Sequence, residues 1–247
     1  AVSFVDGGPA SWGGNDNAYG NNHGSGDIQG IINSLDYIKD LGMNSIWITP
    51  LFVSNTSDVR RSSTGYFASN YFQIDSRFGT EDQARTLVNE AHARGMYVFF
   101  DGVFGHFWGD GFQGHPTRND LYPANAGSGT ATYPDDLAFF TEVATYWIRE
   151  LKIDGWRLDL AYEVPLEYWD DIRLAVEQTS SEVTYSFTDD EGNTTQRNPL
   201  GYMVGEVWRG AQEITDAAYG PEGSPGLYSA FDFPMRYAAM QTFAVEE

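Results

Sequence analysis

The sequence predicts an α/β fold, a TIM (β/α)8 barrel in which this chain supplies about six β/α units. Apolar runs rich in β-branched and aromatic residues alternate with stretches of helical periodicity, which indicates a parallel sheet with helical crossovers. Several of these runs end in charged residues, as expected at the C-terminal rim of a barrel. An open, doubly wound sheet would also hold about six strands, but no glycine-rich phosphate loop follows the first run, which disfavours a dinucleotide-binding sheet.

The first half of the chain shows strand and helix patterns in alternation. In order, the expected elements are a strand at 1–5, a helix at 28–41, a strand at 45–49, a helix at 80–94 and a strand at 96–103. Apolar residues recur every three or four positions in the first helix, and Gly42 follows it as a terminating glycine. The second helix follows Thr80, an N-cap residue, and has an acidic first turn. The segments 6–26 and 50–79 are expected to be loops.

The second half continues the alternation. The expected elements are a helix at 137–151, a strand at 153–159, a helix at 166–176, a strand at 202–206, a short helix at 212–218, a strand at 227–233 and a helix opened by Pro234. Residues 107–135 are rich in Gly, Asn, Pro and Asp and are expected to form a short excursion after the third strand. Residues 180–200 alternate polar and β-forming residues and are expected to form a hairpin insertion. We assign 1–247 to one incomplete catalytic barrel.

The chain is strongly acidic. Its 247 residues include 35 Asp and Glu against 14 Lys and Arg, giving a formal net charge of −21. Such a field repels phosphate backbones and anionic lipids, so we expect neither nucleic acid nor a membrane as partner, whereas a neutral polysaccharide is unaffected. A carboxylate-rich surface is typical of many soluble proteins and also of proteins adapted to salt, and both explanations stay open.

Aromatic and cysteine usage narrow the chemistry further. Aromatic residues make up 15% of the chain, which suits a core and also a groove in which flat rings stack on sugars. Cysteine is absent, which excludes thiolate nucleophiles and thiolate metal ligands.

No apolar run reaches the roughly 18 residues of a membrane span. The chain begins at Ala1 without a signal peptide, so we expect processing or a piece of a larger protein, with a secreted or periplasmic location.

A basic and an acidic residue end the fourth expected strand. Arg157 and Asp159 are two positions apart in an extended run, so both side chains point to one face. A neighbouring guanidinium lowers the pKa of a carboxylate and orients it, which is what an anionic nucleophile needs. A structural salt bridge has the same pattern, so this pair alone does not establish catalysis.

A second carboxylate ends the fifth expected strand. Glu206 lies between Val204 and Trp208, and apolar and aromatic walls favour the protonated form of a carboxyl group, which suits a general acid. Two carboxyl groups in different protonation states make the catalytic pair of a glycosidase. A lone Glu before a Trp is common on surfaces, so the expectation depends on its combination with Asp159.

The third strand offers a different chemistry. Asp101 and His106 lie at its end, and Asp, His and Glu together at a barrel mouth also suit a divalent metal ion. Against this, only His106 and His115 of the four histidines lie near such a rim, and the sequence contains no HExxH or HxH pattern. Metal binding at the rim is therefore the weaker interpretation.

These segments resemble the motifs of the alpha-amylase family of glycoside hydrolases. The matching positions are Asp101, Val103 and His106 for its first motif, Gly155, Arg157 and Asp159 for its second, and Glu206 for its third. The resemblance implies that Asp159 is the covalent nucleophile, that Arg157 orients it, and that Glu206 is the acid and base.

The resemblance also assigns substrate contacts. Tyr66 matches a Gly-Tyr pair whose ring stacks under the sugar at the cleavage point. His106 is expected to hydrogen-bond the same sugar, and Asp101 and Trp208 are expected to be further substrate-binding residues. The expected partner is therefore an α-glucan.

The chain departs from the family pattern at the positions that hold calcium in many members. Gly105 replaces an Asn, and Tyr162-Glu163 stand where a His follows the nucleophile, so calcium is not expected there. The loop after the first strand instead resembles a calcium loop of neopullulanases and cyclodextrin glucanotransferases, with Asp6 and Asp27 as ligands. Asp27 as a simple helix cap is an equally good interpretation. No organic cofactor is expected.

The family's fourth motif, which supplies a third catalytic carboxylate, has no counterpart in this chain. We therefore expect a missing segment or a second chain to complete the barrel. The expected function is that of a retaining glycoside hydrolase acting on α-1,4-linked glucans such as starch, maltooligosaccharides and cyclodextrins. A transglycosylase of the same family, or a non-catalytic sugar-binding or scaffold relative, stays an alternative.

Overall fold

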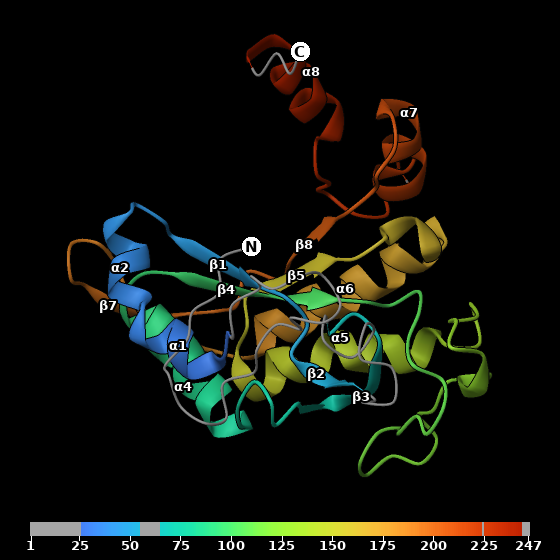
Figure 1. The fold of residues 1–247 in the computed structure, drawn as a ribbon, viewed down its shortest axis with the longest axis horizontal. Coiled ribbons are helices and arrows are strands. Elements are labelled where there is room, and N and C mark those ends of the chain that lie inside the picture. The colour runs from blue at the N-terminus through green and yellow to red at the C-terminus, as the bar shows by residue number, and fades with distance from the viewer. Residues whose placement is uncertain (1–25, 55–64, 224, 244–247) are drawn as a thin grey trace, which may run out of the picture.

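A parallel sheet forms the centre of the molecule. The computed structural model describes residues 26–54, 65–223 and 225–243, so the strand expected at 1–5 lies outside the described residues. The sheet has the order β1-β4-β5-β8, formed by Ser45–Ile48, Tyr97–Gly102, Gly155–Leu158 and Tyr202–Gly205 (Figure 1). Strand order follows chain order without the reversal of a doubly wound sheet, so the sheet forms part of a (β/α)8 barrel.

Helices α4, α5 and α6 lie along one side of this sheet, whereas α8 projects away from it (Figure 1). The helices are α1 Ile28–Asn33, α2 Leu35–Asp40, α4 Glu81–Ala93, α5 Leu137–Leu151, α6 Leu166–Glu182, α7 Ala211–Ile214 and α8 Phe233–Phe243. Between α5 and the sheet, Trp147 and Trp156 are fully buried. The indole N–H of each donates to a backbone carbonyl at 2.9 Å, so the largest core side chains leave no unpaired donor. None of the helices in the described ranges is long and apolar enough to cross a membrane.

Two expected helices have different limits in the structure. The helix expected at 28–41 is interrupted at Ser34, whose ψ of 2° ends α1 and whose hydroxyl donates to the carbonyl of Gly30 at 2.8 Å. A serine that bonds back to the preceding turn competes with the helical ladder, and the apolar stripe gives no sign of this. The helix expected at 166–176 extends to Glu182 because no glycine or proline follows Val176 to end it.

Two expectations about strands are wrong. The segment 50–79, expected to be a loop, contains the antiparallel pair β2, Phe52–Ser54, and β3, Ala68–Ile74. All but one of the β3 residues are buried, so the strand lacks the alternation by which a half-exposed strand is recognised. Residues 227–233, expected to be a strand, form only a single bridge between Ala230 and Gly205.

A hairpin lies within 180–200. Its strands are β6, Tyr185–Thr188, and β7, Thr194–Arg197, which pair antiparallel. The Tyr185 hydroxyl donates to buried Asp154 at 2.7 Å, and its ring stacks on His92 with centroids 3.6 Å apart. Asp154 also accepts the backbone N–H of Val98 in β4 at 2.8 Å. The hairpin is thus fixed to the end of the sheet opposite the rim that carries the charged motifs.

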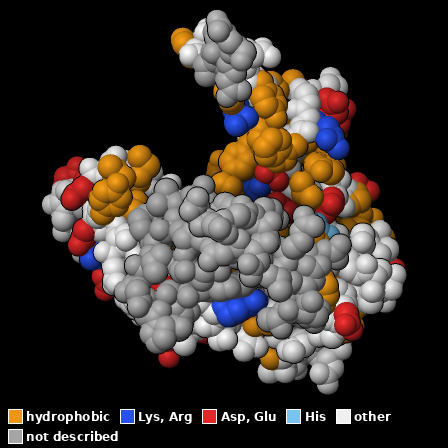
Figure 2. Space-filling model, in the orientation of Figure 1, with side chains coloured by type: hydrophobic (Ala, Val, Ile, Leu, Met, Phe, Trp, Pro, Cys, Tyr) orange, Lys and Arg blue, Asp and Glu red, His pale blue; other side chains and the backbone are white. Residues whose placement is uncertain are grey.

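Apolar side chains gather on the surface of α8 and of the segments that lead to it (Figure 2). The large, exposed members of this surface are Trp208, Tyr228, Met235, Tyr237, Met240 and Phe243. Exposed apolar side chains gathered in one region often mark a contact region of a soluble protein. That another segment or chain completes the barrel here stays a prediction.

The contact between β5 and β8 depends on Gly155. Its φ is +149°, and a Cβ atom at this position would lie 1.8 Å from the carbonyl oxygen of Tyr202. Both the backbone conformation and the space therefore require glycine. The strands that carry the two central motifs are held in register by this close approach.

Replacing Gly155 by Ala should lower the free energy of unfolding by about 2–6 kcal/mol, from overpacking and from backbone strain of about 1–3 kcal/mol each. Gly192→Ala is the matched control, because Gly192 also has a positive φ of +81° but has nothing within 4 Å of an added Cβ. The control should cost about 1–2 kcal/mol. Urea unfolding midpoints measure both changes. Equal costs for the two variants would contradict the close-approach argument.

Candidate active site

Three neighbouring strands bring their charged residues to one rim of the sheet. Asp101 of β4 is the register partner of Arg157 in β5, and Leu158 of β5 is the partner of Gly205 in β8. Asp159 and Glu206 therefore follow directly on adjacent strand ends. The register converts three distant sequence motifs into one cluster, as the carboxyl ends of parallel strands do in barrels.

The guanidinium of Arg157 lies at the centre of this cluster. One terminal nitrogen, Nη1, donates to Asp101 at 2.9 and 3.1 Å and to Asp159 Oδ1 at 2.7 Å, and the other, Nη2, forms an ion pair with Glu206. The side chain of Arg157 is only 5% exposed. Three carboxylates thus share one buried cation, and the two carboxylates expected to do chemistry are bridged by the same planar group.

Two aromatic residues complete the surroundings of Asp101. Tyr66 Oη donates to Asp101 Oδ2 at 2.9 Å, and Trp47 Nε1 donates to the same oxygen at 3.0 Å. The guanidinium carbon of Arg157 lies 4.8 Å from the centre of the Trp47 ring, within cation–π distance. Sequence analysis did not identify Trp47. The feature that could have indicated it is its position one residue from the end of β1, where an indole N–H can reach the rim.

Burial changes the protonation of these carboxyl groups. Burial raises the pKa of Asp101 to about 7, although Arg157 and the hydrogen bond from Tyr66 lower it. Burial also raises the pKa of Asp159 above its ordinary value, with Glu206 adding to the rise and Arg157 opposing it. The expectation that the guanidinium leaves Asp159 with a lowered pKa is therefore wrong, because desolvation outweighs the ion pair. Tyr66 likewise has a raised pKa, from burial and from Asp101, and so stays a phenol.

A strained turn follows Asp159. Leu160 adopts a left-handed conformation with φ 41° and ψ 53°, which is unusual for a residue with a side chain. Its N–H donates to Glu206 Oε2 at 3.3 Å, and the next N–H, of Ala161, donates to the Glu206 carbonyl at 2.8 Å. The turn after Asp159 is therefore hydrogen-bonded to Glu206. These hydrogen bonds offset the backbone strain at Leu160.

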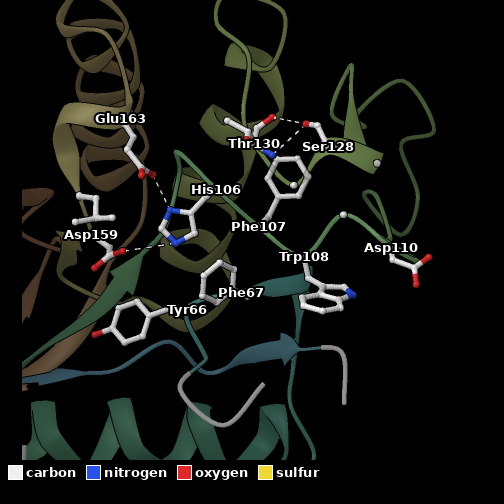
Figure 3. Close-up of a pocket in the computed structure, with 14 residues that line it drawn as sticks. Tyr66, Phe67, His106, Phe107, Trp108, Asp110, Ser128, Thr130, Asp159 and Glu163 are labelled. Atoms are coloured by element: carbon white, nitrogen blue, oxygen red, sulfur yellow. Dashed lines mark hydrogen bonds and ion pairs between the residues drawn. The ribbon is translucent and has the colours of Figure 1, made fainter. Parts of the chain in front are cut away.

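A cavity of about 720 Å³ opens beside Asp159. The side chains of Tyr66, Phe67, His106, Trp108 and Thr130 line it, as Figure 3 shows. Part of its wall comes from 107–110 and 127–130, within the stretch that the sequence marks as an excursion. The cavity is therefore bounded on one side by Asp159, His106 and Glu163 and on others by aromatic rings, which suits a ligand with polar hydroxyls and apolar faces.

His106 lies between two carboxylates at the edge of this cavity (Figure 3). Its Nε2 is 3.8 Å from Asp159 Oδ2, and its Nδ1 is 2.6 Å from Glu163 Oε2. Sequence analysis noted Glu163 only as a departure from a calcium-binding pattern. Its position four residues after Asp159 carries no signal of this contact, because the contact depends on the turn at Leu160.

Two further predicted site residues have other partners in the structure, and one lies outside the described residues. Trp208 is 47% exposed and stacks on Phe233 with ring centres 4.3 Å apart. Asp27 is buried and caps α1 by accepting the N–H of Gly30 at 2.6 Å, and Asp6 lies outside the described residues. In the part of the chain that the structure describes, no three His, Cys, Asp or Glu side chains are arranged to hold a metal ion. Calcium bound by Asp6 and Asp27 stays a prediction.

Comparisons with known proteins identify the family to which this chain is similar. The family model "Alpha amylase, catalytic domain" matches residues 4–116. An intracellular maltogenic amylase of Bacillus subtilis (strain 168) is 33% identical over 245 residues, covering 89% of this chain and 37% of the relative. A cyclomaltodextrinase of Thermoanaerobacter pseudethanolicus is 31% identical, covering 89% of this chain and 38% of the relative.

The solved structures to which this chain is similar also include amylases. A crystal structure of AmyP in complex with maltose is 51% identical to this chain, with a TM-score of 0.88, and the match covers 98% of this chain and 48% of AmyP. The structure of an Anoxybacillus alpha-amylase is 26% identical with a TM-score of 0.68, covering 94% of this chain and 51% of that one. This chain spans about half or less of each of these proteins. The matched catalytic domain, the curated relatives and the shared fold together show that the chain belongs to the alpha-amylase family.

Proposed function

We propose that the protein carrying this chain is a retaining glycoside hydrolase that cleaves α-1,4-linked glucans through a covalent glycosyl–enzyme. The observation that carries the proposal is the contact of Asp159 and Glu206 with the two terminal nitrogens of one guanidinium. A nucleophile and an acid on either side of a glycosidic bond need this closeness, about 5–5.5 Å between carboxyl groups in retaining enzymes. Starch, maltooligosaccharides and cyclodextrins are the proposed substrates, which the names of the maltogenic amylase and cyclomaltodextrinase relatives support.

In the proposed first step, Asp159 attacks the anomeric carbon as the glycosidic bond breaks. The bond electrons go to the leaving oxygen, which takes a proton from Glu206. Arg157 holds Asp159 with one oxygen directed at Nη1, so the nucleophile is oriented before substrate arrives. The second Asp159 oxygen, on the side of His106 at 3.8 Å, is the one free to attack.

In the second step, Glu206 removes a proton from water, which displaces Asp159 from the sugar. The bond from the anomeric carbon to Asp159 breaks, and the carboxylate is regenerated. Two inversions at one carbon give net retention of configuration. The Leu160 N–H donates to Glu206 Oε2 at 3.3 Å, and this bond is assigned the role of orienting the carboxyl group of Glu206.

Substrate binding is assigned to the cavity beside the cluster. Tyr66 is held by its hydrogen bond to Asp101, so its ring presents a fixed face for stacking under a sugar. His106 directs Nε2 toward the Asp159 side of the cavity, where a sugar hydroxyl would lie. Trp208, half exposed on the rim, is proposed as an outer sugar contact.

Calcium at Asp6 and Asp27 and a secreted or periplasmic location are proposals from the sequence alone, and no step above depends on them.

The protein should release reducing sugar from soluble starch and from a cyclodextrin, with products first formed as α-anomers. Proton NMR of the anomeric signals during the first turnovers measures this. Products longer than the substrate would instead favour the transglycosylase alternative, in which a sugar hydroxyl replaces water. A first-formed β-anomer would contradict the retaining mechanism.

The two carboxylate variants should fail differently. Asp159→Ala should lose activity on all glucosides, because the covalent route is gone. Glu206→Gln should lose about 10²–10⁴-fold on starch but still be glycosylated by an activated aryl glucoside, whose leaving group needs no proton. Azide should then restore its turnover by attacking the glycosyl–enzyme without base catalysis. Rescue of neither variant, or near-normal activity in Asp159→Ala, would refute the assigned roles.

Activity should fall in mild acid. Only ionised Asp159 attacks, and its pKa is raised above 3.8, so the acidic limb of kcat/KM on a neutral maltooligosaccharide should lie above about pH 4. When its ring is protonated, His106 lowers the pKa of Asp159, so His106→Gln should move that acidic limb to higher pH. A limb that moves to lower pH in His106→Gln would show that another group controls it.

A further inference from the structure

We propose that Glu163 is the positioning residue of His106, and that Gly105 lacks a side chain in order to admit it. The inference rests on the proposed function to the extent that His106 contacts the sugar. It adds a residue that the sequence motifs do not assign, and it explains the one departure within the first motif. Three features of the structure carry it: a hydrogen bond, a steric fit and a turn.

The hydrogen bond fixes the tautomer of His106. Glu163 Oε2 lies 2.6 Å from Nδ1 of the ring, and a carboxylate can only accept. Nδ1 therefore carries the proton. In the neutral ring Nε2 is then an acceptor, directed toward Asp159 and the cavity, where it meets the hydroxyl of a bound sugar. A histidine acts in one defined role when its other nitrogen is fixed in this way.

The steric fit explains Gly105. A Cβ atom on Gly105 would lie 2.3 Å from Glu163 Cβ and 2.5 Å from Glu163 Oε2, distances that real side chains do not reach. Gly105 has no positive φ, so its backbone conformation does not require glycine. Space for the Glu163 side chain is the remaining reason, and any larger residue at position 105 would displace the carboxylate from His106.

The turn after the nucleophile delivers Glu163 to this place. Left-handed Leu160 reverses the chain, and the short 3₁₀ helix Ala161–Glu163 follows, with Glu163 N–H donating to the Leu160 carbonyl at 2.8 Å. The same turn donates to Glu206. One strained turn thus positions both Glu206 and Glu163, so both side chains are held at fixed places relative to Asp159.

Other contacts hold the backbone and one face of His106 but do not choose between its nitrogens. His106 forms a β-bridge with Thr130, and the Phe67 ring centre lies 5.0 Å from its own. Neither contact distinguishes Nδ1 from Nε2. Glu163 is 32% exposed, so its effect is expected through the hydrogen bond and not through a long-range field, which solvent screens.

Kinetics of single and double variants test the coupling. Glu163→Ala should lower kcat/KM on a maltooligosaccharide about 10-fold or more, whereas Glu163→Gln, which keeps an acceptor for Nδ1–H, should stay within about 3-fold of wild type. In a His106→Ala background, Glu163→Ala should add less than about 2-fold, because the residue it positions is gone. Glu167→Ala, an exposed glutamate of α6, is the control for loss of one nearby charge.

A second readout does not depend on catalysis. Nitrogen-15 NMR of the histidine rings, assigned by the signal missing from His106→Ala, should show the proton of neutral His106 on Nδ1 in the wild type and a mixture of tautomers in Glu163→Ala. Gly105→Ala should give the same mixture.

The two readouts separate the outcomes. A wild type inactive on glucans would refute the proposed function while the tautomer still tests the positioning. Two results would overturn the proposal. One is an unchanged His106 tautomer in Glu163→Ala, and the other is a loss of kcat/KM from Glu163→Ala that is as large in the His106→Ala background as in the wild type.

Discussion

The guanidinium of Arg157 allows three carboxylates to lie together at the end of a buried sheet. Like charges about 4 Å apart repel by about 4 kcal/mol at an effective dielectric of 20, so the negative charge that these carboxyl groups carry needs a cation beside it. Arg157 contacts all three. Removing one partner of such a buried set typically costs about 3–5 kcal/mol, which makes this cluster a structural element as well as a chemical one.

The fold positions the cluster through close backbone contacts. Gly155 lets β5 approach β8, and the resulting register places Arg157 beside Asp101 and Glu206. Left-handed Leu160 then folds the chain after Asp159 back toward β4 and β8. The backbone strain is therefore located at Leu160, directly after the proposed nucleophile and before Glu163, the partner of His106. Backbone strain is commonly found at such places in active sites.

The alternation of strands and helices was predictable because fully buried strands read as apolar runs, because α4 and α5 have clear helical periods, and because α4 begins at an N-cap residue. The site was predictable in part, because residues two apart on a strand share a face and strand ends share a rim. Buried β3 was missed because it lacks alternation and because its buried polar residues Ser69 and Asn70 interrupt an apolar run. The contact of His106 with Glu163 joins positions 57 apart and depends on an unusual φ at Leu160, which no local pattern encodes. The raised pKa of Asp159 depends on burial, which sequence neighbours do not reveal.

The central claim is that Asp159, held by Arg157, forms a covalent bond to the sugar. A 5-fluoro-α-glucosyl fluoride tests it directly, because its fluorine slows the second step and the good leaving group drives the first, so the glycosyl–enzyme accumulates. Peptide mass spectrometry of the digested protein then locates the label. The account predicts a single glycosylated peptide with the sugar on Asp159. A sugar on Asp101 or Glu206, or turnover of glucans that gives inverted product and no adduct, would contradict it.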